Sequence, residues 1–303
     1  MANRTWFITG INRGLGRNLA EALLERGDRV AGTARRLGEL VGLKAMYSER
    51  LWTAALDLSD AGAIRSVVDR AFADLGRIDV VVNNAGSSVV GAVEEVTEEM
   101  IRHLLDTNLL GSILVVKAAL PHLRAQGGGR ILQVSSALGQ SALPGISLYV
   151  ASKWGIEGFI ESTAQDVAPF GIEATICEPG SIRTDFGATA AVSPAIAAYD
   201  GTPARGIRSR VESRRRTEIS NEPGRSREDG QGDDRFRRSV PRAEAPGHGL
   251  RRLQYAQCRL PRSYRVARDA EGARVLDGFL SPKKSLVELF EVGSGSGPVL
   301  PRG

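Results

Sequence analysis

The sequence predicts an α/β fold: a doubly wound, Rossmann-like parallel sheet whose last strand and C-terminal tail are atypical. Three observations predict it. Apolar runs of strand length alternate with segments of helical spacing over residues 1–200. These runs are apolar almost without interruption, as in parallel sheets covered by helices on both faces. A glycine-rich turn follows the first run, where such sheets bind dinucleotides.

Six segments are predicted to be strands because each is short, apolar and bounded by turn residues. They are Thr5–Thr9, Arg29–Thr33, Leu51–Leu56, Ile78–Asn83, Arg130–Ser135 and Glu173–Cys177. Doubly wound sheets bind their ligands at the carboxyl ends of the strands. The chemistry is therefore expected directly after these six segments.

Four segments between the strands have helical spacing. The first carries an apolar face from Leu15 and stops at Gly27, and the second is Ala63–Leu75. The third begins at Thr97, with two glutamates in its first turn, and runs towards Leu123. The fourth is Leu148–Val167. Right-handed crossovers through such helices generate the doubly wound sheet.

Composition limits the class of protein. The chain has 303 residues, of which 42% are hydrophobic and 25% charged, which is ordinary for a globular protein. It has neither a signal-peptide pattern nor a run of 18 apolar residues, so no membrane association is expected. Two cysteines and three histidines fit no disulfide framework or metal spacing, so no metal site is predicted. We therefore expect a cytoplasmic protein.

The charge distribution divides the chain near residue 200. Residues 1–200 carry 18 Lys and Arg against 22 Asp and Glu, whereas residues 201–303 carry 22 against 13. The later part contains 20 Arg and only 2 Ile. We therefore expect a dinucleotide-binding catalytic domain over 1–200 and an Arg-rich tail over 201–303 that is disordered or aberrant.

The turn after the first strand reads Thr9-Gly10-Ile11-Asn12-Arg13-Gly14-Leu15-Gly16. Gly10 would permit a tight turn, Gly14 a close approach to a pyrophosphate, and Gly16 close packing of helix on strand. The free N–H groups at the helix start would bind the phosphates. A plain turn is the alternative, because the spacing differs from the usual G-x-G-x-x-G.

The end of the second strand indicates which dinucleotide fits. A carboxylate there would bind the ribose hydroxyls of NAD, but this strand runs into Arg35 and Arg36 and no carboxylate is available. Guanidinium groups suit a 2′-phosphate, and Arg13 could approach the same phosphate from the glycine loop. These residues favour NADP(H); the alternative is that the arginines are simply solvated.

Tyr149 and Lys153 lie one helical turn apart, and Ser136 follows the fifth strand. A tyrosine with a pKa of about 10 is a poor base, but a nearby ammonium would lower that pKa and make the phenol usable in proton transfer. The Ser136 hydroxyl could hold a substrate carbonyl oxygen. A Tyr-x-x-x-Lys pair alone has little weight, since surface helices contain many.

Together these motifs resemble the short-chain dehydrogenase/reductase family, in its single-domain NADP(H)-dependent branch. The matching residues occur in family order over about residues 4–187. They are the glycine turn Thr9–Gly16, Asp57, Asn83-Asn84-Ala85-Gly86, Asn108, Ser136, Tyr149-Val-Ala-Ser-Lys153, and Pro179-Gly180 with Thr184.

The resemblance implies a role for each matching residue. Asn108 would hold a water in a proton relay towards Lys153, Ser136 would orient the substrate, and Tyr149 would transfer the proton, so the catalytic set is Asn108, Ser136, Tyr149 and Lys153. Asn84, Ala85 and Gly86 would line the adenosine side and stabilise the sheet. The implied cofactor-binding residues are Gly10, Asn12, Arg13, Gly14, Leu15, Gly16, Arg35, Asp57, Leu58, Asn84, Ala85, Gly86, Tyr149, Lys153, Pro179, Gly180, Ile182 and Thr184.

The resemblance also implies an oxidoreductase that transfers a hydride between NADP(H) and a carbonyl or alcohol, with Tyr149 as general acid and base. The nicotinamide performs the difficult chemistry and the protein positions and polarises the substrate. A mostly apolar ketone or secondary alcohol is expected, because the wall between Ser136 and Tyr149 is apolar. The residues expected to bind it are Ser136, Leu138, Leu143, Ile146 and Tyr149, with an Ala-rich lid over about residues 186–202.

The tail departs from the family, whose members continue with a helix and a seventh strand that complete the sheet and much of a homo-oligomer interface. Arg205–Arg216 and Arg225–Arg242 are Arg-rich, no convincing strand is found between residues 201 and 249, and the tail is expected to be largely disordered. Three explanations stay open. The tail could be a basic arm for nucleic acid, which its sparse aromatics make a weak candidate. It could be a solvated extension, or GC-rich coding DNA read out of frame.

Loss of the last strand would expose a sheet edge and remove the oligomer interface. The alternative function is therefore a catalytically impaired or non-enzymatic dinucleotide-binding protein with a basic tail. The intact Ser136, Tyr149 and Lys153 argue against it, because a binding module needs no proton donor.

Overall fold

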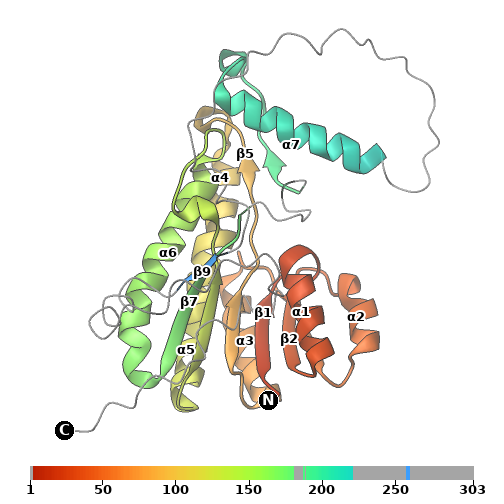
Figure 1. Ribbon diagram of the computed structural model, residues 1–303, viewed down its shortest axis with the longest axis vertical. Coiled ribbons are helices and arrows are strands. Elements are labelled where there is room, and N and C mark those ends of the chain that lie inside the picture. The colour runs from red at the N-terminus through yellow and green to blue at the C-terminus, as the bar shows by residue number, and fades with distance from the viewer. Residues whose placement is uncertain (1–2, 181–186, 188, 221–256, 260–303) are drawn as a thin grey trace.

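The computed structural model describes residues 3–180, 187, 189–220 and 257–259. Its centre is a seven-stranded sheet in the order β3-β2-β1-β4-β6-β7-β9. All neighbouring strands are parallel except β7 and β9. The predicted doubly wound sheet is confirmed (Figure 1).

The predicted strands lie within one or two residues of the observed ones. They are β1 (Thr5–Thr9), β2 (Arg29–Ala34), β3 (Leu51–Ala55), β4 (Val80–Asn83), β6 (Gly129–Val134) and β7 (Ile172–Glu178). Strand order reverses between β1 and β4, which is the switch point where such sheets hold ligands.

The helices pack on both faces of the sheet. On one face lie α3 (Ala61–Leu75), α5 (Gly111–Ala125) and α6 (Ser147–Val167), and on the other lie α1 (Gly14–Arg26) and α2 (Val41–Met46). Alternation along β1 divides its side chains between two cores: Phe7 packs with α3, whereas Trp6 and Ile8 pack with α1. The short α2 and its preceding turn η1 (Leu37–Leu40) were not predicted.

The predicted third helix is one continuous stretch from Glu98 to Ala125, built from α4 (Glu98–Leu105), a π-helical turn η3 (Asp106–Leu110) and α5. By length and composition this is the one described helix that could cross a membrane. Its α5 part packs against α3 and strands β4 and β6, which accounts for the apolar composition within the protein core. The π-helical turn places Asn108 at a local widening of the helix, a feature often found at functional sites.

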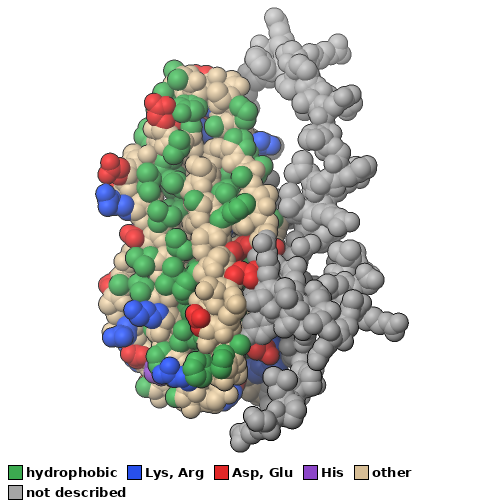
Figure 2. Space-filling view, turned by 90° about the vertical axis from the view of Figure 1, so that its left-hand side faces the viewer, with side chains coloured by type: hydrophobic (Ala, Val, Ile, Leu, Met, Phe, Trp, Pro, Cys, Tyr) green, Lys and Arg blue, Asp and Glu red, His purple; other side chains and the backbone are tan. Residues whose placement is uncertain are grey.

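Short elements connect the sheet to the region above its carboxyl ends. A second sheet pairs β5 (Val89–Val90) with β8 (Ala191–Val192), and the turns η2 (Val93–Glu95), η4 (Ala137–Gly139) and η6 (Ala197–Tyr199) belong to the same region. The turn η5 (Ala168–Phe170) instead joins α6 to the start of β7. Figure 1 shows α7 above the carboxyl ends of the strands, opposite the N-terminal edge of the sheet. Figure 2 views the molecule from the α6 side and shows hydrophobic side chains interspersed between charged ones at the margins.

The tail was expected to be largely disordered, and the structure describes two regular elements within it. Residues Pro203–Ser220 form α7, and Gln257–Arg259 form β9, which pairs with Ile176–Glu178 of β7 in the antiparallel direction. Arg is a good helix former, and Arg208 pairs with Glu212 one turn later, so the Arg-rich composition is compatible with a helix. Because β9 covers part of β7, that sheet edge is paired at its carboxyl end. Arg225–Arg242 lie outside the described residues.

Candidate active site

The glycine turn links the end of β1 to the N-terminus of α1. Gly10 (φ +73°) and Gly14 (φ +59°) adopt the left-handed conformation that favours glycine. The amides of Gly10 and Ile11 donate to the carbonyl of Thr33 at 3.0 and 2.9 Å, which ties the turn to β2. Helix α1 has no side-chain cap and no acid in its first turn. Its N-terminus is therefore suited to a pyrophosphate.

Gly16 packs against the segment after β4. A Cβ there would lie 2.2 Å from Asn84 Nδ2 and 2.3 Å from the carbonyl oxygen of Gly10. Asn84 Nδ2 donates to the carbonyls of Thr9 and Gly10, while Thr9 Oγ1 accepts the amides of Asn84 and Ala85 at 3.0 Å. The predicted sheet-stabilising role of this segment is therefore visible. Glycine at these positions lets the turn pack directly on this segment, and the uncapped N-terminus of α1 beside it fits the pyrophosphate of a dinucleotide.

The end of β2 departs from expectation. Arg35 and Arg36 follow it as predicted, but a carboxylate is available: Glu39, on η1, accepts from Arg36 Nε at 3.0 Å and from Asn12 Nδ2 at 2.7 Å. Sequence reasoning missed it because Glu39 stands four residues past Arg35, and only the tight η1 turn brings it back to the glycine loop. Asp57 accepts the amide and hydroxyl of Ser59, which lower the pKa of its carboxyl, as Arg35 also does.

Tyr149, Lys153 and Ser136 come together at the carboxyl ends of β6 and β7. Tyr149 and Lys153 are buried on α6, and Lys153 Nζ lies 5.6 Å from the centroid of the Tyr149 ring. Nζ donates to the carbonyl of Val134 at 3.0 Å. The hydroxyls of Tyr149 and Ser136 are hydrogen-bonded to each other. Ser136 Oγ also accepts the amide of Leu138 at 3.2 Å, which fixes the loop after β6.

The protonation of this group differs from the expectation. Burial raises the pKa of Tyr149 above its ordinary value, and the hydrogen bond to Ser136 opposes this rise only in part. The expected lowering by Lys153 is not what the structure shows. Burial lowers the pKa of Lys153 to about 8, and the negative charge of Glu157 raises it in part. Tyr149 is therefore a protonated phenol at neutral pH, and Lys153 a lysine that can lose its proton near that range.

Asn108 fastens the segment after β4 to α6. Its Oδ1 accepts the amide of Ser87 at 2.7 Å, and its Nδ2 donates to the carbonyl of Ser87 at 2.8 Å and to Ser152 Oγ at 3.2 Å. A Cβ on Gly86 would lie 4.0 Å from Lys153 Nζ, so Asn108, Gly86 and Lys153 are neighbours. The structure thus shows a positioning function for the Asn108 side chain; the water relay stays a prediction.

Glu157 is a buried residue that the sequence reading missed. Its Oε1 accepts from Ser135 Oγ at 2.5 Å, and Gln140 donates to its other oxygen. It follows Lys153 at the same four-residue spacing by which Lys153 follows Tyr149. That repeated spacing was the signal in the sequence that could have placed Glu157 on the active face of α6.

The proposed substrate wall lies beside Tyr149. Leu138 and Ile146 are half-buried and Leu143 is exposed, so these apolar side chains keep part of their surface uncovered. Pro179 accepts the amide of Ala137 at 2.9 Å and so lies next to the Ser136 loop. Ile182 and Thr184, predicted to bind the cofactor, lie outside the described residues, as does Phe186 at the start of the lid.

The described part of the lid is attached to the segment after β4. β8 pairs with β5, and the amide of Ser193 donates to the carbonyl of Val90 at 3.0 Å. Buried Glu95 accepts the amide of Ile196 and forms an ion pair with Arg205 at the start of α7. Tyr199 donates to the exposed Glu94 at 3.0 Å.

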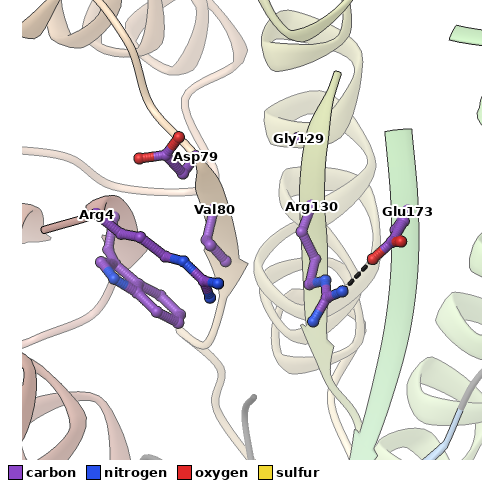
Figure 3. Close-up of a pocket in the computed structure, with 7 residues that line it drawn as sticks. Arg4, Asp79, Val80, Gly129, Arg130 and Glu173 are labelled. Atoms are coloured by element: carbon purple, nitrogen blue, oxygen red, sulfur yellow. Dashed lines mark hydrogen bonds and ion pairs between the residues drawn. The ribbon is translucent and has the colours of Figure 1, made fainter. Parts of the chain in front are cut away.

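A cavity of about 200 Å³ lies at the opposite edge of the sheet, far from this chemistry (Figure 3). It is lined by residues at the N-terminal ends of the strands, among them Arg4, Asp79 and Arg130, whose guanidinium pairs with Glu173. Its lining holds neither the Tyr149 group nor the glycine turn. The site is therefore assigned by side-chain geometry at the carboxyl ends, and this cavity has no part in it.

Comparison with known proteins gives a consistent result. The family model described as short chain dehydrogenase matches residues 4–193. Oxidoreductase BOA17 of Botryotinia fuckeliana is 43% identical over 194 residues, which are 64% of this chain and 71% of that protein. The 3-ketodihydrosphingosine reductase of Bacteroides thetaiotaomicron is 35% identical over 59% of this chain and 64% of its own, so the chain spans less than two thirds of that relative.

Solved structures agree. A short-chain dehydrogenase from Streptomyces avermitilis has a TM-score of 0.64 and 37% identity, covering 73% of this chain and 85% of its own. A metagenomic short-chain oxidoreductase solved in complex with NADP has a TM-score of 0.57 and 30% identity, covering 60% of this chain and 85% of its own.

Proposed function

Because the chain belongs to the short-chain dehydrogenase family, we propose that it is an oxidoreductase that transfers a hydride between NADP(H) and a mostly apolar ketone or secondary alcohol. One observation carries the proposal above the others. Tyr149 and Ser136, from α6 and the loop after β6, hold their hydroxyls in a shared hydrogen bond beside buried Lys153. Two converging hydroxyl groups of this kind can bind one carbonyl oxygen.

The residues of the site suit proton donation to that oxygen. Bound NADPH would supply the hydride to the carbonyl carbon. Tyr149 would donate its proton to the oxygen as negative charge develops there, and its raised pKa keeps the proton available at neutral pH. Ser136 would hold the same oxygen in place. Lys153, with a pKa near 8, would return a proton to Tyr149 after each turnover.

NADP(H) is preferred to NAD(H) in this proposal because Arg13, Arg35 and Arg36 stand at the glycine turn and at the end of β2. Guanidinium groups bind a phosphate through paired N–H donors. The metagenomic relative solved with NADP supports this choice.

We further expect a cytoplasmic protein.

An apolar substrate is supported by the half-buried Leu138 and Ile146 and the exposed Leu143. It is also supported by relatives named retinol dehydrogenase 8 and 17-beta-hydroxysteroid dehydrogenase type 1, both human and 33% identical to this chain over 66% and 61% of its length. Retinol and steroids are largely hydrocarbon. We therefore expect ketones with extended apolar groups to be better substrates than small polar ones.

The test is Tyr149→Phe, which removes the proton donor and keeps the ring. We expect NADPH to bind the variant as it binds the native protein, and NADPH oxidation with a panel of apolar ketones to be abolished. Binding measured by calorimetry and turnover measured by NADPH absorbance separate the two. Substantial turnover by the variant, or none by the native protein with any ketone, would count against the proposal; the second result would favour a non-enzymatic dinucleotide-binding protein.

A further inference from the structure

The carboxylate of Glu39 occupies the corner between the glycine turn and the end of β2. One of its oxygens accepts from Nε and Nη2 of Arg36, at 3.0 and 2.5 Å. The other accepts from the side-chain amide of Asn12 at 2.7 Å. The backbone amide of Glu39 also donates to the carbonyl of Arg36 at 3.3 Å, which closes the η1 turn. Glu39 thus bridges two segments that a dinucleotide would have to contact together.

The electrostatics of this corner hold the carboxylate in its charged form. Arg36 makes the largest contribution to lowering the pKa of Glu39, and Asn12 and the charge of Arg13 lower it further. The Glu39 side chain is 33% exposed, whereas that of Arg36 is 82% exposed. The Glu39 side chain is therefore held more firmly than the Arg36 side chain, which lies on the surface.

The donors that bind Glu39 are those that a phosphate would use. A guanidinium and an amide N–H, pointing at two oxygens of one anion, are equally suited to a carboxylate and to a phosphate monoester. The same N–H groups cannot serve both anions, and two anions side by side repel each other. NAD(H) has a free ribose hydroxyl in place of the 2′-phosphate, so its binding brings no second anion next to Glu39.

We infer that Glu39 is a specificity-determining residue that competes with the 2′-phosphate of NADP(H) for Arg36 and Asn12, and so weakens the selection of NADP(H) over NAD(H). This inference rests on the proposed function, since it presupposes a dinucleotide bound at the glycine turn. It names a residue by which the cofactor preference of this chain can be raised.

The test compares dissociation constants of NADPH and NADH, measured by calorimetry, for the native protein and Glu39→Gln. Glutamine keeps the size and can still accept from Asn12, but it releases Arg36. We expect the variant to bind NADPH about two- to fivefold more tightly, the range of one exposed ion pair, and to bind NADH unchanged. The difference should shrink at high salt, because salt screens the repulsion between the two anions.

The matched control is Glu98→Gln. Glu98 is another exposed glutamate, and it pairs with Arg102 of its own helix at 3.4 Å. Its replacement by glutamine therefore breaks a similar ion pair and changes the net charge by the same amount. It should leave both affinities unchanged. In the double variant Arg36→Gln with Glu39→Gln, the gain in NADPH affinity should disappear, because the released donor is gone.

Three results would overturn the inference. Weaker NADPH binding by Glu39→Gln would mean that the carboxylate orients Arg36 for the phosphate. Unchanged or equally changed affinities for both cofactors would mean that Glu39 does not discriminate between them, and the proposed function would stand. If the native protein bound neither cofactor, both the inference and the proposed function would fall.

Discussion

The carboxylate of Glu95 accepts the backbone amide of Ile196 at 2.9 Å, although 101 residues separate them. Its other oxygen accepts the amide of Ala92, and Arg205 approaches to 3.3 Å. Arg205 in turn donates to the carbonyl of Ile196 and forms an ion pair with Asp200. One buried acid therefore fastens the lid and the start of α7 to the segment that follows β4.

Glu95→Gln should loosen this lid. Glutamine offers one acceptor oxygen where the carboxylate uses two, and it removes one of the two acids that pair with Arg205, a loss on the order of 1–3 kcal/mol. We expect a higher KM for the ketone, an unchanged affinity for NADPH, and faster hydrogen exchange of the Ile196 amide. Glu99→Gln, an exposed change on α4, is the control. An Ile196 amide that stayed equally protected would contradict this description of the lid.

Lys153 should make stability depend on pH. Its pKa is about 8 in the folded protein and near 10.5 when exposed, so between pH 8 and 10 the unfolded chain binds a proton that the folded chain has lost. The free energy of unfolding should therefore rise with pH in this window, by at most about 1.4 kcal/mol per unit, while the full cost of burying the charge applies below pH 8. Urea denaturation across this range measures the rise.

Lys153→Met should flatten that profile, because methionine fills the space without a charge. Lys117→Met, at an exposed position of α5, should leave the native slope intact. Equal slopes for the native protein and Lys153→Met would show that another group is responsible.

Gly16→Ala should abolish NADPH binding. The added Cβ would meet the backbone carbonyl of Gly10 at 2.3 Å, and because backbone cannot move aside as a flexible side chain does, the glycine turn must shift. Gly42→Ala on α2, where the new Cβ meets nothing within 4 Å, should leave binding intact and stabilise the helix by up to about 1 kcal/mol. Calorimetric titration with NADPH distinguishes the two variants. Normal binding by Gly16→Ala would show that the turn does not hold the phosphates.

The reading frame of the tail can be tested on the gene. Residues 228–234 read Glu-Asp-Gly-Gln-Gly-Asp-Asp. Shifted forward by one base, the codons for this stretch encode six residues. The first and fourth can only be Lys or Arg, and the second and sixth can only be Met or Thr. The third is limited to Ala, Val, Gly or Asp, and the fifth to Ala, Val, Gly or Glu. The pattern places basic residues three apart and Met or Thr four apart, which is helical spacing.

We therefore expect the shifted frame upstream and downstream of residue 228 to encode an amphipathic helix followed by an apolar strand. Sequencing the gene and its transcript checks this. A chain expressed in the restored frame should unfold at a higher temperature than the present one. If neither neighbouring frame contains a helix and a strand, the Arg-rich tail is the native sequence of this protein.

The main helices and strands could be predicted because their patterns are local. Thr5–Thr9 is apolar and bounded by turn residues, and it forms β1 with those limits. β5 and β8, of two residues each, carry no periodicity, and α2 is short and follows a turn. α7 was missed because it is Arg-rich and has few apolar residues, although the pair of Arg208 and Glu212 at helical spacing is a local signal for it.

By itself, the sequence determined the doubly wound sheet, the glycine turn and the membership of Ser136, Tyr149 and Lys153 in one site, because strand order and helical spacing bring these residues to one sheet edge. The tertiary structure decided the pKa values of these groups and the partners of the buried and surface acids. Burial raises the pKa of Tyr149 and lowers that of Lys153. Contacts between distant residues join Glu39 to Asn12, 27 residues away, and Glu95 to Ile196, 101 residues away. Burial and long-range contact depend on the whole packed chain, so neither can be read from spacing along it.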